Sequence, residues 1–362
     1  MLIKVSSQLA LAILSLTLVL LCVPGAFAQP GTIDSNYLAN ANGAVRSIAL
    51  QPDGKLLISG EFNLVSGLPR HCVARLNSDG ALDEQFGAPF DGGYAQKILL
   101  QPDGRAVVGG SFQQAGTYLP ALVRISTNGA LDPSFVVESS QSFWKAFACQ
   151  SDGNILVAGD SDLVRLLPNG SLDTNFTVLS SYQLQTNEDG SVSTANISFS
   201  SLAVLPDGRI LVGGNFAGVF GSPVSGLIRL NPNGALDPTF RPATNWNAEC
   251  LALLEDGTIL SGGSTQYGPG AVRRFHADGE PEPSFLAATT FSGHLRALAI
   301  QPDGKIIAAG IFDSVNGLPW RHIARLNSGG TLDLGIRFIG LGANRHLGPA
   351  GGWCRSCRRL VR

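Results

Sequence analysis

The stretch Gln51-Pro52-Asp53-Gly54-Lys55-Leu56-Leu57 decides the fold, because its Asp-Gly core returns five more times at intervals of about fifty residues. The six glycines of this core are 50, 49, 55, 49 and 47 residues apart, and each is followed six residues later by another glycine. A period of about fifty residues indicates a repeat architecture, in which each copy is one structural unit. The core glycines are Gly54, Gly104, Gly153, Gly208, Gly257 and Gly304.

Each repeat has a second glycine turn, with an arginine five residues before the glycine and an acid three residues after it; in the first repeat these are Arg75, Gly80 and Asp83. A three-residue loop that ends in a left-handed glycine makes the flanking strands symmetric about its middle residue. The spacing therefore predicts Leu76 opposite Leu82 and Arg75 opposite Asp83, in a structural ladder of exposed ion pairs worth about 0.2 to 1 kcal/mol each. The other pairs are Arg124 with Asp132, Arg165 with Asp173, Arg229 with Asp237, Arg274 with Glu282, and Arg325 with Asp333.

One repeat is thus two hairpins, residues 45–50 with 55–60 and residues 72–76 with 81–86, which together make a four-stranded meander. Inner strands such as Leu56-Leu57-Ile58 are apolar at successive positions, so both of their faces must be covered. Repeats stacked side by side around an axis would bury both faces of these strands against their neighbours. We expect an all-β fold, a β-propeller of about six four-stranded blades over residues 29–333.

A family resemblance supports this expectation. The phrases Gln301-Pro302-Asp303-Gly304-Lys305 and Ile323-Ala324-Arg325-Leu326-Asn327 resemble the delta-60 repeat, a β-propeller family of bacterial exported and surface proteins with no established activity. The resemblance covers residues 31–333. The third repeat, with a short loop at 160–162, and the fifth, with Pro281 and Glu282 in place of Leu-Asp, depart from the pattern, so irregular blades are expected there.

The two ends of the chain do not follow the full repeat. Residues 1–28 combine Lys4, an apolar run over 9–23 and a small-residue site at 26–28, the pattern of a cleaved secretory signal rather than a membrane anchor. Residues 33–37 repeat the end of a unit, and we expect them to supply the outer strand of the last blade and so remove its open edge. Residues 334–362 hold six arginines and no acid, which fits either a non-native tail after a reading-frame shift or a basic tail for an anionic surface.

Several kinds of chemistry have no support in the sequence. A formal charge of -2 gives no basic face for nucleic acid. The cysteines form no disulfide framework, and Cys72, Cys149 and Cys250 look like small buried apolar residues. The Asp-Gly turns lack the closely spaced acids of a calcium loop, and no histidine has metal-ligand spacing. We assign no catalytic, cofactor-binding or metal-ligating residue.

The repeats differ most from one another in the loops opposite the Asp-Gly turns, and recognition sites on rigid scaffolds usually lie in such loops. The aromatic residues of this loop face are Trp144, Trp246, Trp320, Tyr118 and Tyr267, either as contact rings or as partly buried side chains. We expect a monomeric binding module for a protein or glycan that is secreted, at the cell surface or periplasmic, with no membrane span after signal cleavage. The alternatives are a lactonase-like or sugar-hydrolase-like enzyme with a metal in the axial channel, and a fragment of a larger adhesin-like array.

Overall fold

The computed structural model describes residues 39–137, 144–160, 162–177, 179–180, 184–186, 192–194, 198–219, 222–242, 246–265, 268–285 and 289–336. The expected signal at 1–28, the closing strand at 33–37 and most of the basic tail lie outside these ranges. Within them the regular structure is β-strand apart from one helical turn, η1 (Pro283–Phe285). No helix in these ranges is long and apolar enough to cross a bilayer.

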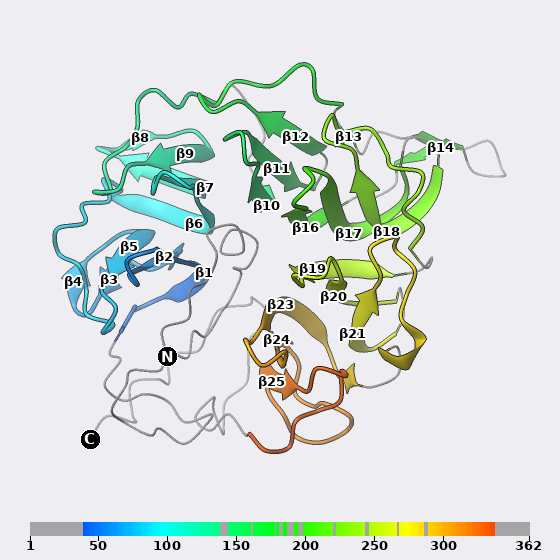
Figure 1. Cartoon of the computed structure of the whole chain (residues 1–362). Coiled ribbons are helices and arrows are strands. Elements are labelled where there is room, and N and C mark those ends of the chain that lie inside the picture. Colours follow the sequence, from blue (N-terminus) through cyan, green and yellow to red (C-terminus); the bar gives the residue numbers. More distant parts are fainter. Residues whose placement is uncertain are drawn as a thin grey trace.

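Six repeated units of three main antiparallel strands follow one another around an arc, with the first strand of each unit toward the middle (Figure 1). We number these units 1 to 6 in chain order. Contacts between the first strands of consecutive units join the units to each other. The first strands are β1 (Ala44–Leu50), β6 (Gly92–Leu100), β10 (Trp144–Cys149), β16 (Ser198–Val204), β19 (Asn247–Leu253) and β23 (His294–Ile300).

The second and third strands of each unit lie progressively farther from the middle (Figure 1). The second strands are β2 (Leu56–Glu61), β7 (Ala106–Gln114), β11 (Ile155–Gly159), β17 (Ile210–Val219), β20 (Ile259–Ser264) and β24 (Ile306–Ile311). The third strands are β5 (Val73–Leu76), β9 (Leu122–Ile125), β12 (Asp162–Leu166), β18 (Ser222–Leu230), β21 (Gly270–Phe275) and β25 (Ile323–Leu326). Short strands join them: β3 (Leu64–Val65), β4 (Leu68–Pro69), β8 (Thr117–Tyr118), β13 (Leu179–Ser180), β14 (Leu184–Thr186), β15 (Val192–Thr194) and β22 (Thr290–Phe291).

Both predicted hairpins have the predicted register. Ile48 pairs with Ile58 in the first hairpin, and Leu76 pairs with Leu82 in the second. The loop glycines, Gly54 and Gly80 in unit 1, have φ values of 84° and 86°, in the left-handed region where L-residues other than glycine are strained. Glycine at the third loop position therefore sets which residues face each other.

The fourth segment of each unit is shorter than expected. It pairs with the third strand at a single bridge, such as Leu326 with Leu332 in unit 6, rather than along a strand from residue 81 to residue 86 or its equivalent. The reason is local: the Phe86 amide donates to the Asp83 carbonyl, and the Asp83 side chain accepts from the Gln85 amide, so the chain turns immediately after the acid. Units 3 and 5 keep this layout despite their sequence departures.

The core consists of apolar layers, most of them between consecutive units. Second strands are buried on both faces, as Leu56, Leu57 and Ile58 show with 5%, 2% and 4% of their surface exposed. Burial on both faces confirms the prediction drawn from the non-alternating apolar runs. The all-β architecture, with units placed around a common middle as in a propeller, is confirmed.

Candidate functional site

The end of each unit that carries the glycine turns is dominated by the predicted ion pairs. Arg75 Nε lies 2.9 Å from Asp83 Oδ2, and the same pair forms in every unit. Unit 5 uses Glu282, whose Oε2 accepts from Arg274 Nε at 2.5 Å. The remaining pairs join Arg124 to Asp132, Arg165 to Asp173, Arg229 to Asp237, and Arg325 to Asp333 at 2.7 to 2.9 Å.

These pairs are mostly buried, which corrects the expectation of an exposed ladder. The side chains of Arg229 and Asp237 are 4% and 6% exposed. A second cation, from the first hairpin, reaches the same carboxylate in four units: Lys55 Nζ lies 2.8 Å from Asp83 Oδ2. The other three are Arg105 on Asp132, Arg209 on Asp237 and Lys305 on Asp333. In five units the guanidinium also covers a phenylalanine ring, as Arg75 does over Phe86 at 4.7 Å.

The carboxylates are stabilised in their charged form. Burial acts to raise the pKa of Asp132 and of Asp237, but hydrogen bonds from Ser134 and Thr239 and the adjacent arginines outweigh burial and lower both pKa values to about 2. Such acids are fully ionised at neutral pH. They have no proton to donate in acid catalysis, and their lone pairs are taken up by structural donors.

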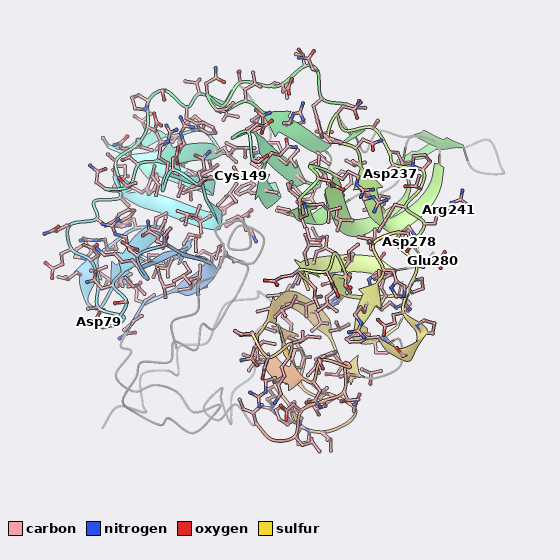
Figure 2. The ribbon with its side chains drawn as sticks, viewed as in Figure 1. Asp79, Cys149, Asp237, Arg241, Asp278 and Glu280 are labelled. Atoms are coloured by element: carbon pink, nitrogen blue, oxygen red, sulfur yellow. The ribbon has the colours of Figure 1, made fainter. Side chains whose placement is uncertain are left out.

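The same arginines join each unit to the next. Arg75 Nη1 donates to the Thr127 carbonyl of unit 2 at 2.5 Å, and Arg229 donates in the same way to Ala277 of unit 5. Figure 2 shows this junction between units 4 and 5, with Asp237 and Arg241 beside Asp278 and Glu280. Because the pattern recurs from unit to unit, the turn end is explained by structure alone.

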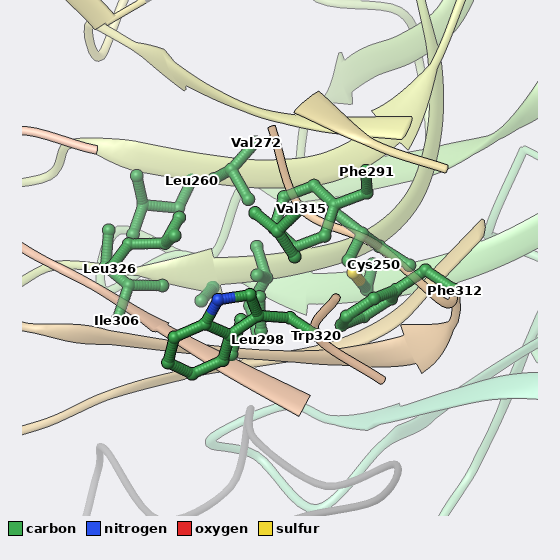
Figure 3. Close-up of a cluster of buried hydrophobic side chains, with 14 of the residues drawn as sticks. Cys250, Leu260, Val272, Phe291, Leu298, Ile306, Phe312, Val315, Trp320 and Leu326 are labelled. Carbon is green, nitrogen blue, oxygen red and sulfur yellow. The ribbon is translucent and has the colours of Figure 1, made fainter. Parts of the chain in front are cut away.

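The aromatic residues expected on the loop face differ in how far they are exposed to solvent. Trp144, Trp246 and Trp320 are 2%, 1% and 7% exposed and belong to the core; Figure 3 shows Trp320 among apolar side chains of units 5 and 6. Their rings therefore fill space between units instead of facing a ligand. Tyr118 is 74% exposed at the tip of a short hairpin, and Tyr267 lies outside the described residues.

The opposite end of the units contains a feature that the sequence reasoning missed. The first strand of every unit has a β-bulge where it pairs with the second strand, and one residue is left out of the ladder. A bulge bends the strand and turns a side chain in a new direction, and bulges are frequent beside functional sites. The side chains at the bulges are of five kinds in the six units: Arg46, Gln96, Lys145, Ser200, Glu249 and Arg296.

We call the six bulged residues and the polar side chains in contact with them the rim. Arg46 Nη2 lies 2.5 Å from Glu61 Oε1 within unit 1. Lys145 forms an ion pair with Asp160 and donates to Ser198 Oγ of unit 4 at 2.9 Å. Further contacts cross the junction between units 5 and 6, where Glu249 Oε1 lies 2.7 Å from His294 Nδ1. The rim thus combines cations, carboxylates, hydroxyls and an amide around the innermost strands.

Two residues that directly follow bulges have shifted pKa values. They are Lys97 of unit 2 and Cys250 at the same position of unit 5. The charges of Glu249 and Arg296 act on the Cys250 thiol. Burial raises the pKa of Cys250 to about 12 and lowers that of Lys97 to about 8, so the thiol is neutral and a fraction of the lysine is neutral near pH 8.

The hydroxyl of Ser198 at the rim lies beside Lys145 and Asp160. A serine beside a lysine can act as a nucleophile when the lysine accepts its proton. Here Lys145 Nζ is directed at the Asp160 carboxylate and donates to Ser198 Oγ, and Ser198 Oγ donates to Asp160 Oδ1. Among the described residues, no three His, Cys, Asp or Glu side chains are grouped so as to hold a metal ion.

Comparison with known families agrees with the repeat and the fold. Five segments match the family described as a domain of unknown function (DUF5122) beta-propeller, at residues 51–86, 101–135, 150–176, 205–240 and 301–335. Each matched segment contains a turn pair and its ion pair. The chain is a β-propeller repeat protein. The description of the matching family does not include the narrower name delta-60 repeat. None of the curated proteins matches this chain.

Solved propellers of low identity are similar to this one in part. A protein of unknown function from Bacteroides caccae is 16% identical, with 65% of this chain and 78% of that chain covered and a TM-score of 0.39. A gluconolactonase from Xanthomonas campestris is 15% identical (72% and 78% covered, TM-score 0.40). The calcium-binding protein regucalcin from Agrobacterium tumefaciens is 14% identical (75% and 82% covered, TM-score 0.39).

A sequence signal for the rim does exist. The second-strand glycine, six residues after the turn glycine, faces the bulged strand at very short range: a Cβ on Gly60 would lie 1.9 Å from the Ala44 carbonyl oxygen. Only glycine, which has no side chain, admits a neighbouring backbone this close. Because the bulge lies opposite this glycine, the position of the glycine marks the rim residue of each unit of the propeller.

Proposed function

We propose that this β-propeller is an exported binding module that holds a glycan at its rim. One observation carries the proposal: the turn end presents an arginine–acid pair in every unit, whereas the rim presents five kinds of polar side chain in the six units. Residues that recur in every unit serve what every unit needs, which is packing and closure of turns. Residues that differ from unit to unit are available to recognise a single asymmetric ligand.

The composition of the rim suits a sugar. Sugar hydroxyls donate and accept hydrogen bonds, so their sites combine donors, acceptors and groups that do both. Lys145 donates, Glu249 accepts, and Gln96 and Ser200 do both. Tyr94, on the inner strand β6, adds an aromatic ring of the kind that packs against a sugar face. The exposed leucines of the outer hairpins, Leu64 and Leu68, lie apart from this polar ring.

The test is binding of the mature chain, residues 29–362, to a glycan array, followed by calorimetry on each glycan retained. Gln96→Ala and Glu249→Gln should each weaken binding about tenfold or more, because each removes a hydrogen-bonding group worth about 1 to 2 kcal/mol. Glu280→Gln, on the outer edge between units 4 and 5 (Figure 2), is the matched control and should have no effect.

Other results would identify another function. Binding that persists in the rim variants but is lost in Leu64→Ser or Tyr118→Ala would place recognition on the outer hairpins, as expected for a protein partner. Turnover of a sugar lactone that depends on added calcium would favour the enzyme alternative. An array on which no glycan is retained contradicts the proposal.

A further inference from the structure

The junction between units 4 and 5 contains three side chains that depart together from the repeat. The other five units have an apolar residue at the position of Arg273 on β21, and another at the position of Ser261 on β20. Trp246, directly before β19, stands where units 1, 2 and 6 have a glycine. The residues at the Arg273 position of the other units are Ala74, Val123, Val164, Ile228 and Ala324, and those at the Ser261 position are Ile58, Val108, Val157, Val212 and Ala308.

The three side chains lie against one another. Trp246 Nε1 donates to Ser261 Oγ at 2.9 Å, and Ser261 is paired with Arg273 across the sheet. The Arg273 guanidinium lies over the Trp246 ring, with its central carbon 4.1 Å from the ring centroid. The ring itself is 1% exposed and belongs to one buried cluster with Leu211 and Leu227 of unit 4. Packing between the units therefore fixes the ring, and the ring fixes the guanidinium.

The charge of Arg273 is not paired with a carboxylate among the described residues. The adjacent Arg274 is held by Glu282, whereas the contact that the structure gives the Arg273 side chain is the Trp246 ring. Burial lowers the pKa of Arg273, and no acid opposes this effect. A guanidinium has five N–H donors, and buried donors normally have acceptors. Because Arg273 is partly exposed, a group from solvent can reach those donors.

We propose that Arg273 is a binding site for the carboxylate of a small acid, between units 4 and 5. The Trp246 ring attracts the cation and keeps it in place when no anion is bound. The ring lies on one side of the guanidinium and takes up none of its conventional hydrogen bonds, so a carboxylate can accept two parallel ones. Two sources supply this chemistry: a free organic acid and the uronate of an acidic sugar.

This site is separate from the rim. The rim residues are on the first strands and close to them, whereas Arg273 is on the third strand of its unit, farther from the middle (Figure 1). Strand β18 of unit 4 borders the site, because Gly226 lies so close to the Trp246 carbonyl that a Cβ has no room there. The inference therefore does not depend on the glycan function proposed for the rim.

The experiment measures the dissociation constants of succinate, glucuronate and glucose for the mature chain by calorimetry, at one pH and ionic strength. At least one of the two acids should bind about tenfold or more tightly than glucose, and its binding should change the tryptophan emission, because the guanidinium lies on Trp246. Arg273→Met, which keeps a flexible chain over the ring, should remove the preference for the acid and leave glucose binding unchanged. Arg273→Lys keeps the charge but not the parallel donors, so its preference should be weaker than that of the parent chain.

Two controls test whether the effect belongs to this arginine. Arg241→Gln changes an exposed arginine at the outer edge of the same junction (Figure 2) and should keep the preference for the acid. Gln96→Ala changes the rim and should keep it as well. Thermal unfolding checks that each variant is folded, and Arg273→Lys carries the test if Arg273→Met is not.

Each outcome decides for or against the site. Equal binding of succinate and glucuronate that needs Arg273 supports it with a free acid as the ligand, and binding of glucuronate alone supports it with a uronate. Acids bound no better than glucose, a preference that both Arg273 variants keep in full, or a preference that Arg241→Gln also loses would each overturn it. None of these results alters the glycan array test, so the two proposals fail separately.

Discussion

Single carboxylates organise the turn end of each unit, and Asp237 shows how. Its Oδ2 accepts from Arg229 and Arg209, and its Oδ1 accepts from the amide and hydroxyl of Thr239. The pairing with Arg229 follows from the spacing around one glycine turn. The contact with Arg209 does not, because Arg209 belongs to the other hairpin and reaches the acid only after the two hairpins have paired.

Asp237→Asn should therefore be strongly destabilising. The amide group would place a donor against two arginine donors and leave a buried positive charge without its partner, at a cost of about 3 kcal/mol. Asp79→Asn is the matched control, since Asp79 is exposed (Figure 2) and its side chain only accepts from the Ala81 amide, which asparagine also allows. Urea unfolding measures both; equal midpoints for the two variants would show that the buried pair contributes little.

The same acids predict how stability depends on pH. Asp132 and Asp237 have pKa values of about 2 in the folded chain, below the value of about 3.9 expected when unfolded. A lowered pKa contributes stability above the unfolded value, and that stability is lost as the pH falls toward the folded value. We expect the contribution of these two acids to the free energy of unfolding to be constant above about pH 5 and to fall by roughly 2 kcal/mol per acid between pH 5 and pH 2. Urea titrations across this range should show a smaller fall in the Asp132→Asn, Asp237→Asn double variant; an unchanged fall would assign the acid sensitivity to other groups.

At the scale of the hairpin, sequence spacing predicted which residues pair. A three-residue turn with a left-handed glycine allows only one register, so the pairing of Leu76 with Leu82 follows from Gly80 alone. The bulge at Arg46 was not predicted, because period-two reasoning assumes an unbroken ladder. The close approach of Gly60 to the bulged strand, which the sequence also marks, carries that information.

The two turn glycines of unit 4 separate backbone strain from contact with the neighbouring unit. Gly208 and Gly234 have φ values of 83° and 89°, so alanine is similarly strained at both, by about 1 to 2 kcal/mol. A Cβ on Gly208 would be in ordinary contact with Pro232, whereas one on Gly234 would lie 2.6 Å from the Thr177 carbonyl oxygen at the end of unit 3. Gly234→Ala should therefore lower the free energy of unfolding by at least about 1 kcal/mol more than Gly208→Ala. Chemical denaturation compares them, and equal losses would mean that the junction adjusts freely.

At the scale of the whole molecule, the sequence predicted that the units stack, because their strands are apolar on both faces. It did not predict the candidate site. The sequence leaves open whether the loop tryptophans are contact rings or partly buried side chains, because loops usually lie at the surface. Trp320 instead packs between units 5 and 6 (Figure 3), an environment that exists only once the units are stacked. The rim residues belong to six different units, and each is set by a bulge that appears only when the first and second strands pair, so no local pattern could group them.

The junction between unit 6 and unit 1 differs from the other five. Val45 and Ile48 of unit 1 and Ala299 and Ile307 of unit 6 are partly exposed, although their counterparts in the other units are buried. Within the described residues, Arg325 forms its ion pair with Asp333 and shows no bond to a following unit of the kind that the five preceding arginines form. Leu332 of unit 6 pairs with Leu326 as its counterparts do in the other units. The place of residues 33–37, which lie outside the described residues, is a matter for experiment.

The turn of unit 1 is a candidate for that place. Turn glycines such as Gly234 and Gly279 are covered by the end of the preceding unit, at Phe176 and Phe240, and Gly80 is buried as well. Residues 31–37 repeat the end of a unit, with Tyr37 at the phenylalanine position. If they cover Gly80, Tyr37→Ala should cost about 3 kcal/mol in urea unfolding, as expected for a buried aromatic ring and as Phe240→Ala should. Tyr118→Ala, at an exposed hairpin tip, should change stability by less than about 0.5 kcal/mol. A Tyr37 variant as stable as the Tyr118 variant would mean that the junction is covered by something other than this segment, and the first unit would then be open to a further repeat.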